Sequence, residues 1–176
     1  MCRYLLMALM LVPAVCPAQE SGDDVWRPLR FLEGVWSGTG EGLSGRSTVT
    51  QRYSFILGGK FLQARTRAAF PKQERNPDGE LHEDMGVFSY DRARKKHVLR
   101  AFYVEGFVNQ FVLEEITEDG RGLTFVAEAI ENAPEGTSAK LVYKLSADGV
   151  LTEQFFVAFP GQELSCFSSN TMTKKH

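Results

Sequence analysis

The sequence contains few of the residues that bind metals or form disulfide bonds. Only three cysteines occur among its 176 residues, and Cys2 and Cys16 both lie in an apolar N-terminal stretch. Without that stretch Cys166 stands alone, so it can form no internal disulfide, and no CxxC pair exists to hold zinc. None of the three histidines forms an HxH or HxxxH pair. We therefore expect no metal site, and we interpret Cys166 as a small apolar residue in a late strand.

The same scarcity argues against a catalytic site. His82 is followed by Glu83 and Asp84, but consecutive strand residues point to opposite faces, so these three cannot all bind one ion. His97 follows two lysines and indicates a solvated turn, and His176 is the last residue. The sequence also lacks a phosphate-binding loop and a nucleophile elbow. We expect no catalytic residues and no cofactor, which argues against an enzyme of the usual hydrolytic types.

The chain has no excess of charge of either sign. Lysine and arginine total 20 and aspartate and glutamate 22, which gives a formal net charge of −2 at pH 7. This balance provides no broad electrostatic surface for nucleic acid or an anionic membrane. The basic run at 92–96 is typical of a solvated turn. We expect no nucleic-acid partner, and the sequence does not indicate an oligomeric state.

Long apolar runs are also absent, apart from one at the N-terminus. Arg3 precedes the apolar residues 4–15, and residues 16–18 form a small-residue cleavage site, which is the pattern of a signal peptide. The run is too short for a comfortable transmembrane helix. An acylated lipoprotein would need a small residue before Cys16, where the bulky Val15 stands. We predict cleavage after residue 18 and export of a soluble chain to the periplasm or the medium.

The glycines that the chain does contain follow an informative pattern. Residues 31–42 read FLEGVWSGTGEG, and Gly38, Gly40 and Gly42 recur at a spacing of two. Because residues two apart share one face of a strand, that face is bare of side chains. A bare face admits a ligand, another backbone or a sharply coiled neighbouring strand. With Trp36 as a large plug on the same face, the segment suits the first strand of a small antiparallel barrel with one open end.

The rest of the chain predicts further strands separated by turn signals. Residues 47–57 alternate, with Val49, Tyr53 and Phe55 on one side, and Gly58-Gly59 then predicts a hairpin. The other expected strands are 60–70, 85–90, 97–104, 107–115, 123–130, 140–146, 150–159 and 164–174. The pattern predicts an all-β protein, an antiparallel up-and-down β-barrel of about ten strands, with a short helix over 27–33 closing one end. The expected organisation is a signal peptide (1–18), an N-terminal segment (19–30) and a barrel domain (31–176).

The predicted interior is rich in aromatic side chains and includes a few polar ones. The chain has 13 Phe, 5 Tyr and 2 Trp. Four polar residues share the inward face, namely Gln51, Thr66, Ser168 and Asn170. An apolar interior with few polar groups describes a small-molecule pocket, although barrels of this size also exist with a filled core. Our candidates for lining such a pocket are Trp36, Gly38, Gly40, Tyr53, Phe55, Leu62, Phe125, Tyr143 and Phe167.

Two segments carry a resemblance to a known family. Residues 31–42 resemble the opening of the nitrobindin-type haem-binding barrels and related calycin-like proteins, and Gly34-Val35-Trp36 is similar to the opening of lipocalins and fatty-acid-binding proteins. Residues 161–164, followed by a strand with Met172 and Lys174, resemble the nitrobindin C-terminus. The resemblance implies a calycin-like barrel with an internal pocket.

The resemblance does not extend to the haem ligand. In that family a histidine of the last strand binds the iron, and its place falls on Phe167, which has no donor atom. We therefore expect an exported barrel that binds a small apolar molecule without haem. Two alternatives remain open, namely a haem protein that uses Cys166 or another ligand, and a filled barrel that acts through a protein partner.

Overall fold

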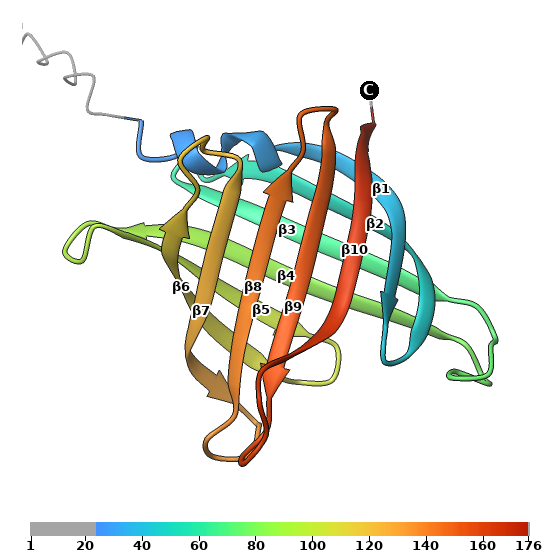
Figure 1. Ribbon diagram of the computed structural model, residues 1–176. Helices are drawn as coiled ribbons and strands as arrows, with labels where there is room; N and C mark the ends of the chain where they lie inside the picture. The colour runs from blue at the N-terminus through green and yellow to red at the C-terminus, as the bar shows by residue number, and fades with distance from the viewer. Residues whose placement is uncertain (1–23, 176) are drawn as a thin grey trace, which may run out of the picture.

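Ten antiparallel strands form a closed barrel in the computed structural model, which describes residues 24–175 (Figure 1). Each strand pairs with its neighbours in the sequence, and β1 pairs with β10 to close the barrel. The predicted all-β class and antiparallel ten-stranded barrel are confirmed. The strands are β1 (Gly34–Gly42), β2 (Gly45–Ile56), β3 (Phe61–Phe70), β4 (Glu80–Asp91), β5 (Lys96–Tyr103), β6 (Val108–Ile116), β7 (Gly122–Glu131), β8 (Ser138–Leu145), β9 (Val150–Ala158) and β10 (Ser165–Lys175).

The predicted signal peptide lies outside the described residues, as do the cleavage site, Cys16 and His176. Among residues 24–175, no helix is long and apolar enough to cross a membrane.

The helix expected at one end of the barrel is not supported as a regular helix. Its place is taken by a 3-10 helix of six residues, η1 (Arg27–Leu32), in which proline stands near the first position. Leu29 and Leu32 are fully buried and join the core below them. Trp26 also belongs to this core, so residues 26–32 pack on the barrel.

The glycine face of β1 allows the barrel to close. Gly38 pairs with Met172 of β10 and with Val49 of β2. A Cβ atom on Gly38 would lie 2.8 Å from the Met172 Cα and nearer still to the Thr171 carbonyl oxygen. Of the three occupants that the bare face could admit, the structure therefore places a neighbouring backbone at Gly38.

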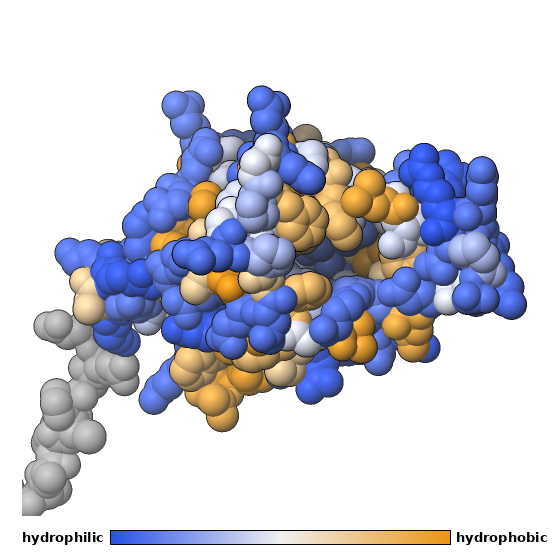
Figure 2. Space-filling model, turned by 90° about the horizontal axis from the view of Figure 1, so that it is seen from below, coloured by the Kyte–Doolittle hydropathy of each residue, from blue (hydrophilic) through white to orange (hydrophobic). Residues whose placement is uncertain are grey.

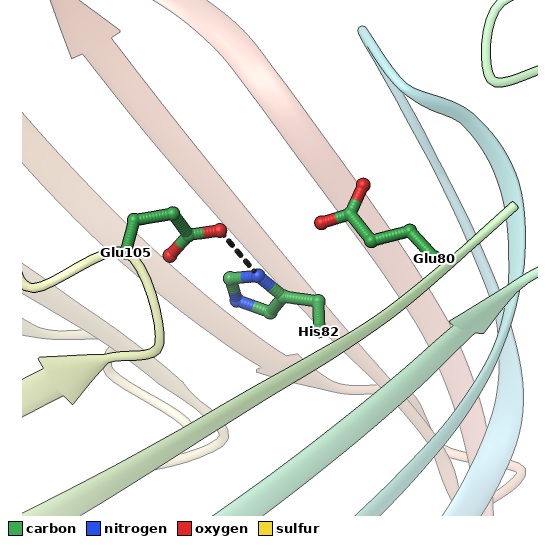
Figure 3. Close-up of side chains that lie close together, drawn as sticks. All are labelled: Glu80, His82 and Glu105. Carbon is green, nitrogen blue, oxygen red and sulfur yellow. Dashed lines mark hydrogen bonds and ion pairs between the residues drawn. The ribbon is translucent and has the colours of Figure 1, made fainter. Parts of the chain in front are cut away.

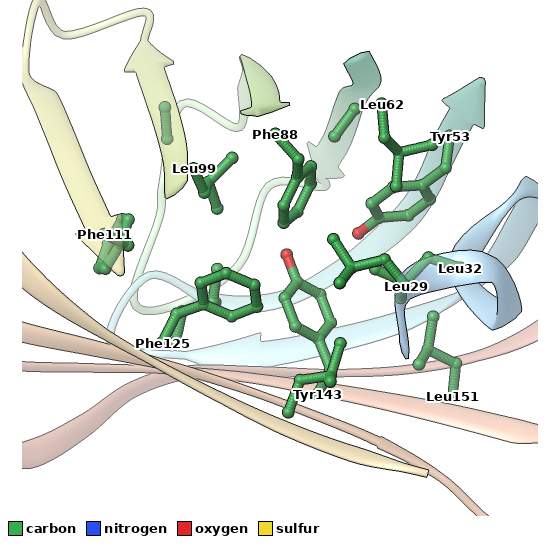
Figure 4. Close-up of a cluster of buried hydrophobic side chains, with 14 of the residues drawn as sticks. Leu29, Leu32, Tyr53, Leu62, Phe88, Leu99, Phe111, Phe125, Tyr143 and Leu151 are labelled. Carbon is green, nitrogen blue, oxygen red and sulfur yellow. The ribbon is translucent and has the colours of Figure 1, made fainter. Parts of the chain in front are cut away.

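The end of the barrel beneath η1 is filled by large apolar side chains. The Trp36 indole is 2% exposed, and its Nε1–H donates to the Leu32 carbonyl oxygen at 2.7 Å. Phe88 and Phe125 meet edge to face in the same core, with ring centroids 5.6 Å apart (Figure 4). The core therefore forms a plug at the η1 end of the barrel. The plug does not extend into the half of the interior that lies away from η1.

Two sequence predictions at surface residues are wrong. His97 is buried rather than solvated, and its Nε2–H donates to the Val25 carbonyl oxygen at 2.6 Å. Trp26 packs beside its ring because the N-terminal segment folds back over β5, which the local sequence does not indicate. Cys166 is exposed rather than packed in the core.

Candidate functional site

The half of the barrel opposite η1 contains a cavity of about 350 Å³. Residues of four of the five hairpin loops at that end surround its mouth, with Leu43, Phe107 and Phe159 among them. Seen from that end, the surface is hollowed between apolar and charged side chains (Figure 2). The volume lies near the lower end of the range for pockets that bind small molecules.

Apolar side chains form most of the cavity wall. Small residues on three neighbouring strands, Ala64 and Ala68 of β3, Gly86 of β4 and Ala101 of β5, leave the space empty. Larger apolar residues on the opposite side enclose it, and these are Leu141, Phe155, Val157 and Phe167. The cavity therefore exists in part because these four positions on one side of the barrel carry only small side chains.

Glu153 of β9 provides the principal charged group at the inner end of the cavity. Its Oε1 accepts hydrogen bonds from Gln51 Nε2 at 2.8 Å and Asn170 Nδ2 at 3.0 Å. Its Oε2 lies 3.3 Å from the Tyr53 hydroxyl, which also donates to Gln51 Oε1 at 2.9 Å. Desolvation raises the pKa of the Glu153 carboxyl, and the negative charge of Asp84 adds to this effect, while the amide donors partly offset it.

Two tyrosines separate the cavity from the core plug. Tyr53 and Tyr143 both line the cavity, and their rings meet edge to face with centroids 6.5 Å apart. On the plug side, Phe125 packs against Tyr143 at 6.2 Å and Phe88 packs against Tyr53 at 6.5 Å. Burial raises the pKa of both phenols well above the ordinary value, so both hydroxyls stay neutral.

A second polar group lies on the β4 wall, nearer the mouth. The Nδ1 atom of His82 is 2.8 Å from a carboxylate oxygen of Glu105 (Figure 3). Its Nε2 is 3.7 Å from a carboxylate oxygen of Asp84. Burial raises the pKa of the Asp84 carboxyl, and the Thr66 hydroxyl and His82 oppose this rise. Glu83, between them in the sequence, points outward to an exposed ion pair with Arg67 at 3.8 Å.

The residues around His82 could also hold a metal ion. Ligand atoms of Glu80, His82 and Glu105 lie within 4.8 Å of one another. From the sequence we rejected the consecutive set His82, Glu83 and Asp84 and expected no metal site. The structure instead brings His82 together with Glu80 and with Glu105 of the β5–β6 loop. Both glutamates are exposed, and Asn76 already donates to Glu80 at 3.1 Å. The group therefore has the ligand types for a cation, but its two glutamate side chains are exposed to solvent.

The nine predicted lining residues divide into three groups. Tyr53, Tyr143 and Phe167 line the cavity, as do the polar residues Thr66, Ser168 and Asn170. Trp36, Leu62 and Phe125 are buried in the plug, and Phe55 packs on Trp26 at the η1 end. Gly38 and Gly40 lie at the β1–β10 seam, beside Met172 and Asn170. Whether the three cavity residues bind a ligand remains a prediction.

The residues present do not fit a haem group. The ring of Phe167 points toward the cavity from a bulge in β10 and packs on Phe155 at 6.0 Å, but it offers no atom to iron. The thiol of Cys166 is exposed and directed to the Ser168 carbonyl oxygen at 3.4 Å. The one imidazole in the wall, that of His82, has a carboxylate near each ring nitrogen.

Sequence reasoning missed most of the polar groups in this site. We predicted a strand only from Met85, whereas β4 begins at Glu80. The first half of β4 directs His82 and Asp84 inward to the cavity, so it lacks the apolar alternation by which strands are recognised. Glu153 was missed because the residues on either side of it on the inward face of β9, Leu151 and Phe155, are apolar.

Comparison with known proteins supports the fold. No known family model matches the sequence, and no curated protein is similar to it. Among solved structures, the crystal structure of Rv2717c from M. tuberculosis matches with a TM-score of 0.66 and 17% sequence identity, covering 87% of this chain and 98% of that chain. At this identity the similarity concerns the fold alone. Together with the closed ten-stranded antiparallel arrangement, it supports the predicted barrel fold.

Proposed function

We propose that this protein is an exported barrel that binds a small, largely apolar molecule in its cavity without haem. The observation that carries the proposal is the cavity itself, a space of about 350 Å³ that opens at one end of an otherwise packed barrel. Protein interiors are normally packed as densely as organic crystals. A space of this size, lined by methyl groups and aromatic rings, is a feature that folding alone does not require.

The arrangement of polar groups supports the same function. Glu153, Gln51 and Asn170 lie at the inner end, while the wall between them and the mouth is mainly apolar. A few fixed polar groups in an apolar pocket orient a ligand, because the apolar wall supplies affinity and the polar groups supply direction. The structure does not favour the filled-barrel alternative, since only the η1 end is packed.

Export is part of the proposal on the basis of the N-terminal sequence. Arg3 and the apolar residues 4–15 have the pattern of a secretory signal. Intact-mass analysis of the protein from the cell envelope should show a chain that begins at Gln19. A diacylglycerol group on Cys16 would instead establish a lipoprotein.

A neutral fluorescent probe tests the cavity as a binding site. N-phenyl-1-naphthylamine emits strongly in apolar surroundings, so its fluorescence should rise when it is titrated with the purified protein. Ala68→Trp places an indole in the cavity and should abolish most of this signal. Ala69→Trp is the matched control, because the next residue of β3 is exposed on the outside of the barrel.

Circular dichroism and denaturation midpoints establish that both variants are folded. Equal probe binding by Ala68→Trp and Ala69→Trp would place the probe elsewhere and contradict the proposal. Native mass spectrometry, followed by organic extraction of any bound molecule, would identify the natural ligand.

A further inference from the structure

The cavity wall carries several acidic side chains and one histidine. Its lining includes the acidic residues Glu80, Asp84, Glu105 and Glu153. Among the described residues that line it, none is lysine or arginine. A carboxylate ligand bound in an apolar pocket needs a cation or several hydrogen-bond donors near its charge. The lining therefore disfavours anionic ligands and leaves a neutral or positively charged one.

The two inner carboxyls are surrounded by protein on the sides away from the cavity. Glu153 is held by Gln51 and Asn170, both of which use their donors on the same oxygen, Oε1. The other oxygen, Oε2, lies 3.3 Å from the Tyr53 hydroxyl, which is closer to Gln51 Oε1, and the Tyr143 hydroxyl also hydrogen-bonds the Glu153 carboxyl. Asp84, on the facing wall, has His82 at 3.7 Å and no nearer cation. Both carboxyls therefore retain acceptor capacity that a ligand in the cavity can use.

A third acceptor in the lining has no partner at all. The Oδ1 atom of Asn109 is the one buried side-chain oxygen or nitrogen without a hydrogen bond in the described part of the chain. Asn109 is 4% exposed and lines the cavity, and its Nδ2 lies 3.5 Å from the Tyr103 hydroxyl. Leaving a buried carbonyl oxygen unpaired is unfavourable, and such groups are rare in native proteins. A donor from a bound molecule would satisfy it.

Aromatic rings complete a surface that suits a cation. Tyr53, Tyr103, Tyr143, Phe155 and Phe167 all line the cavity, and Tyr103 packs on Phe155 with centroids 6.4 Å apart. The faces of such rings attract ammonium groups, more strongly where water is excluded. Carboxylates, an unpaired amide oxygen and aromatic faces all interact favourably with the same chemical group.

We propose that the cavity selects a ligand with an apolar body and a protonated amine, whose ammonium group lies at the inner end against Glu153 and Asp84. This inference rests on the proposed function, because it assigns the chemical class of the ligand that the cavity holds. The apolar body occupies the space beside Ala68 and Ala101, and the amine hydrogens are donated to the carboxylates and to the amide oxygen of Asn109.

Three probes with the same eight-carbon chain test this selectivity. Octylammonium, 1-octanol and octanoate are each used to displace N-phenyl-1-naphthylamine from the purified protein near pH 7.5. EDTA is present, so that metal ions bound near His82 do not compete. We expect octylammonium to bind about tenfold or more tightly than octanol, and octanoate to bind more weakly than either, because the ammonium group gains charge-assisted hydrogen bonds.

Two isosteric variants test whether Glu153 and Asp84 cause the preference for octylammonium. Glu153→Gln keeps an acceptor oxygen for Gln51 and Asn170, and the new amide nitrogen can donate to the Tyr53 hydroxyl, so the fold should be retained. It should weaken octylammonium about tenfold and leave octanol unchanged, and Asp84→Asn should act in the same direction. Glu83→Gln is the matched control, since it removes the same charge from the outward face of β4 and should change neither probe.

The outcomes distinguish ligand binding in the cavity from its preference for an amine. If octanol and octylammonium bind equally, or octanoate binds most tightly, the cavity binds ligands but the inference about the amine is overturned. The inference is also overturned if Glu153→Gln and Asp84→Asn, shown to be folded, leave the preference for octylammonium intact. If neither the fluorescent probe nor any of the eight-carbon compounds binds, the proposed function itself fails.

Discussion

Replacing Gly38 with alanine should destabilise the barrel where β1 meets β10. The added Cβ would lie 2.8 Å from the Met172 Cα and still closer to the Thr171 carbonyl oxygen. Both are backbone atoms of β10, which is also paired with β9, so relief requires a shift of the strand rather than a side-chain rotation. Overpacking in a rigid interior typically costs about 1–3 kcal/mol, and this site belongs at the upper end of that range.

Part of that loss is offset in the unfolded chain. Alanine restricts the unfolded backbone more than glycine does, which stabilises the protein by roughly 0.4–1 kcal/mol. The expected net change for Gly38→Ala is therefore a loss of about 2 kcal/mol in the free energy of unfolding. Guanidinium denaturation, followed by the fluorescence of the buried residues Trp26 and Trp36, measures this quantity.

Gly86→Ala is the matched control because it carries the same unfolded-state gain. Its Cβ would meet only a terminal methyl group of Leu99 at 2.8 Å, which can rotate away, and its next contact is 3.6 Å from Ala64. We expect a change within about 1 kcal/mol for this variant. If Gly38→Ala and Gly86→Ala were equally stable, β10 would not approach β1 as closely as the structure shows, and the reasoning would be refuted.

Two further perturbations test the plug and the inner carboxyl. Trp36→Ala should lose roughly 3–5 kcal/mol of unfolding free energy, because it removes a large buried ring, and a loss below about 1 kcal/mol in denaturation would contradict its burial. Because burial raises the pKa of Glu153, its contribution to stability is fully present below the ordinary carboxyl pKa and is lost as pH rises through the raised value. Glu153→Gln should therefore gain stability over the wild type at about pH 7 and little at about pH 4, and equal changes at both pH values would contradict the raised pKa.

The locally encoded parts of the structure could be predicted from the sequence. Alternation of apolar and polar residues has a period of two in any strand, so the strands of 47–57 and 60–70 were recognisable without knowledge of their partners. The glycines at 38, 40 and 42 indicated a close approach on one face of the first strand, and the backbone of β10 makes that approach. The burial of Trp36 followed from the same face pattern.

Where local sequence and tertiary environment disagree, the prediction failed. Residues 80–84 were not recognised as part of a strand because their inward side chains are polar, and the cavity explains why a strand tolerates them. His97 looked solvated because its chain neighbours are lysines, yet Trp26 and Val25 cover it from 71 and 72 positions away. The expected helix at 27–33 is a short 3-10 turn held by the side chains that it packs on.

The sequence by itself therefore determined the barrel, because strand periodicity, turn residues and the glycine stripe are properties of short segments. It did not determine what the barrel interior offers to a ligand. Asp84, Asn109 and Glu153 belong to β4, β6 and β9, and no spacing along the chain relates them. Only the closure of the barrel around a half-empty interior places their oxygens on one cavity. Because these oxygens are largely removed from water there, a hydrogen bond from a ligand donor is favourable.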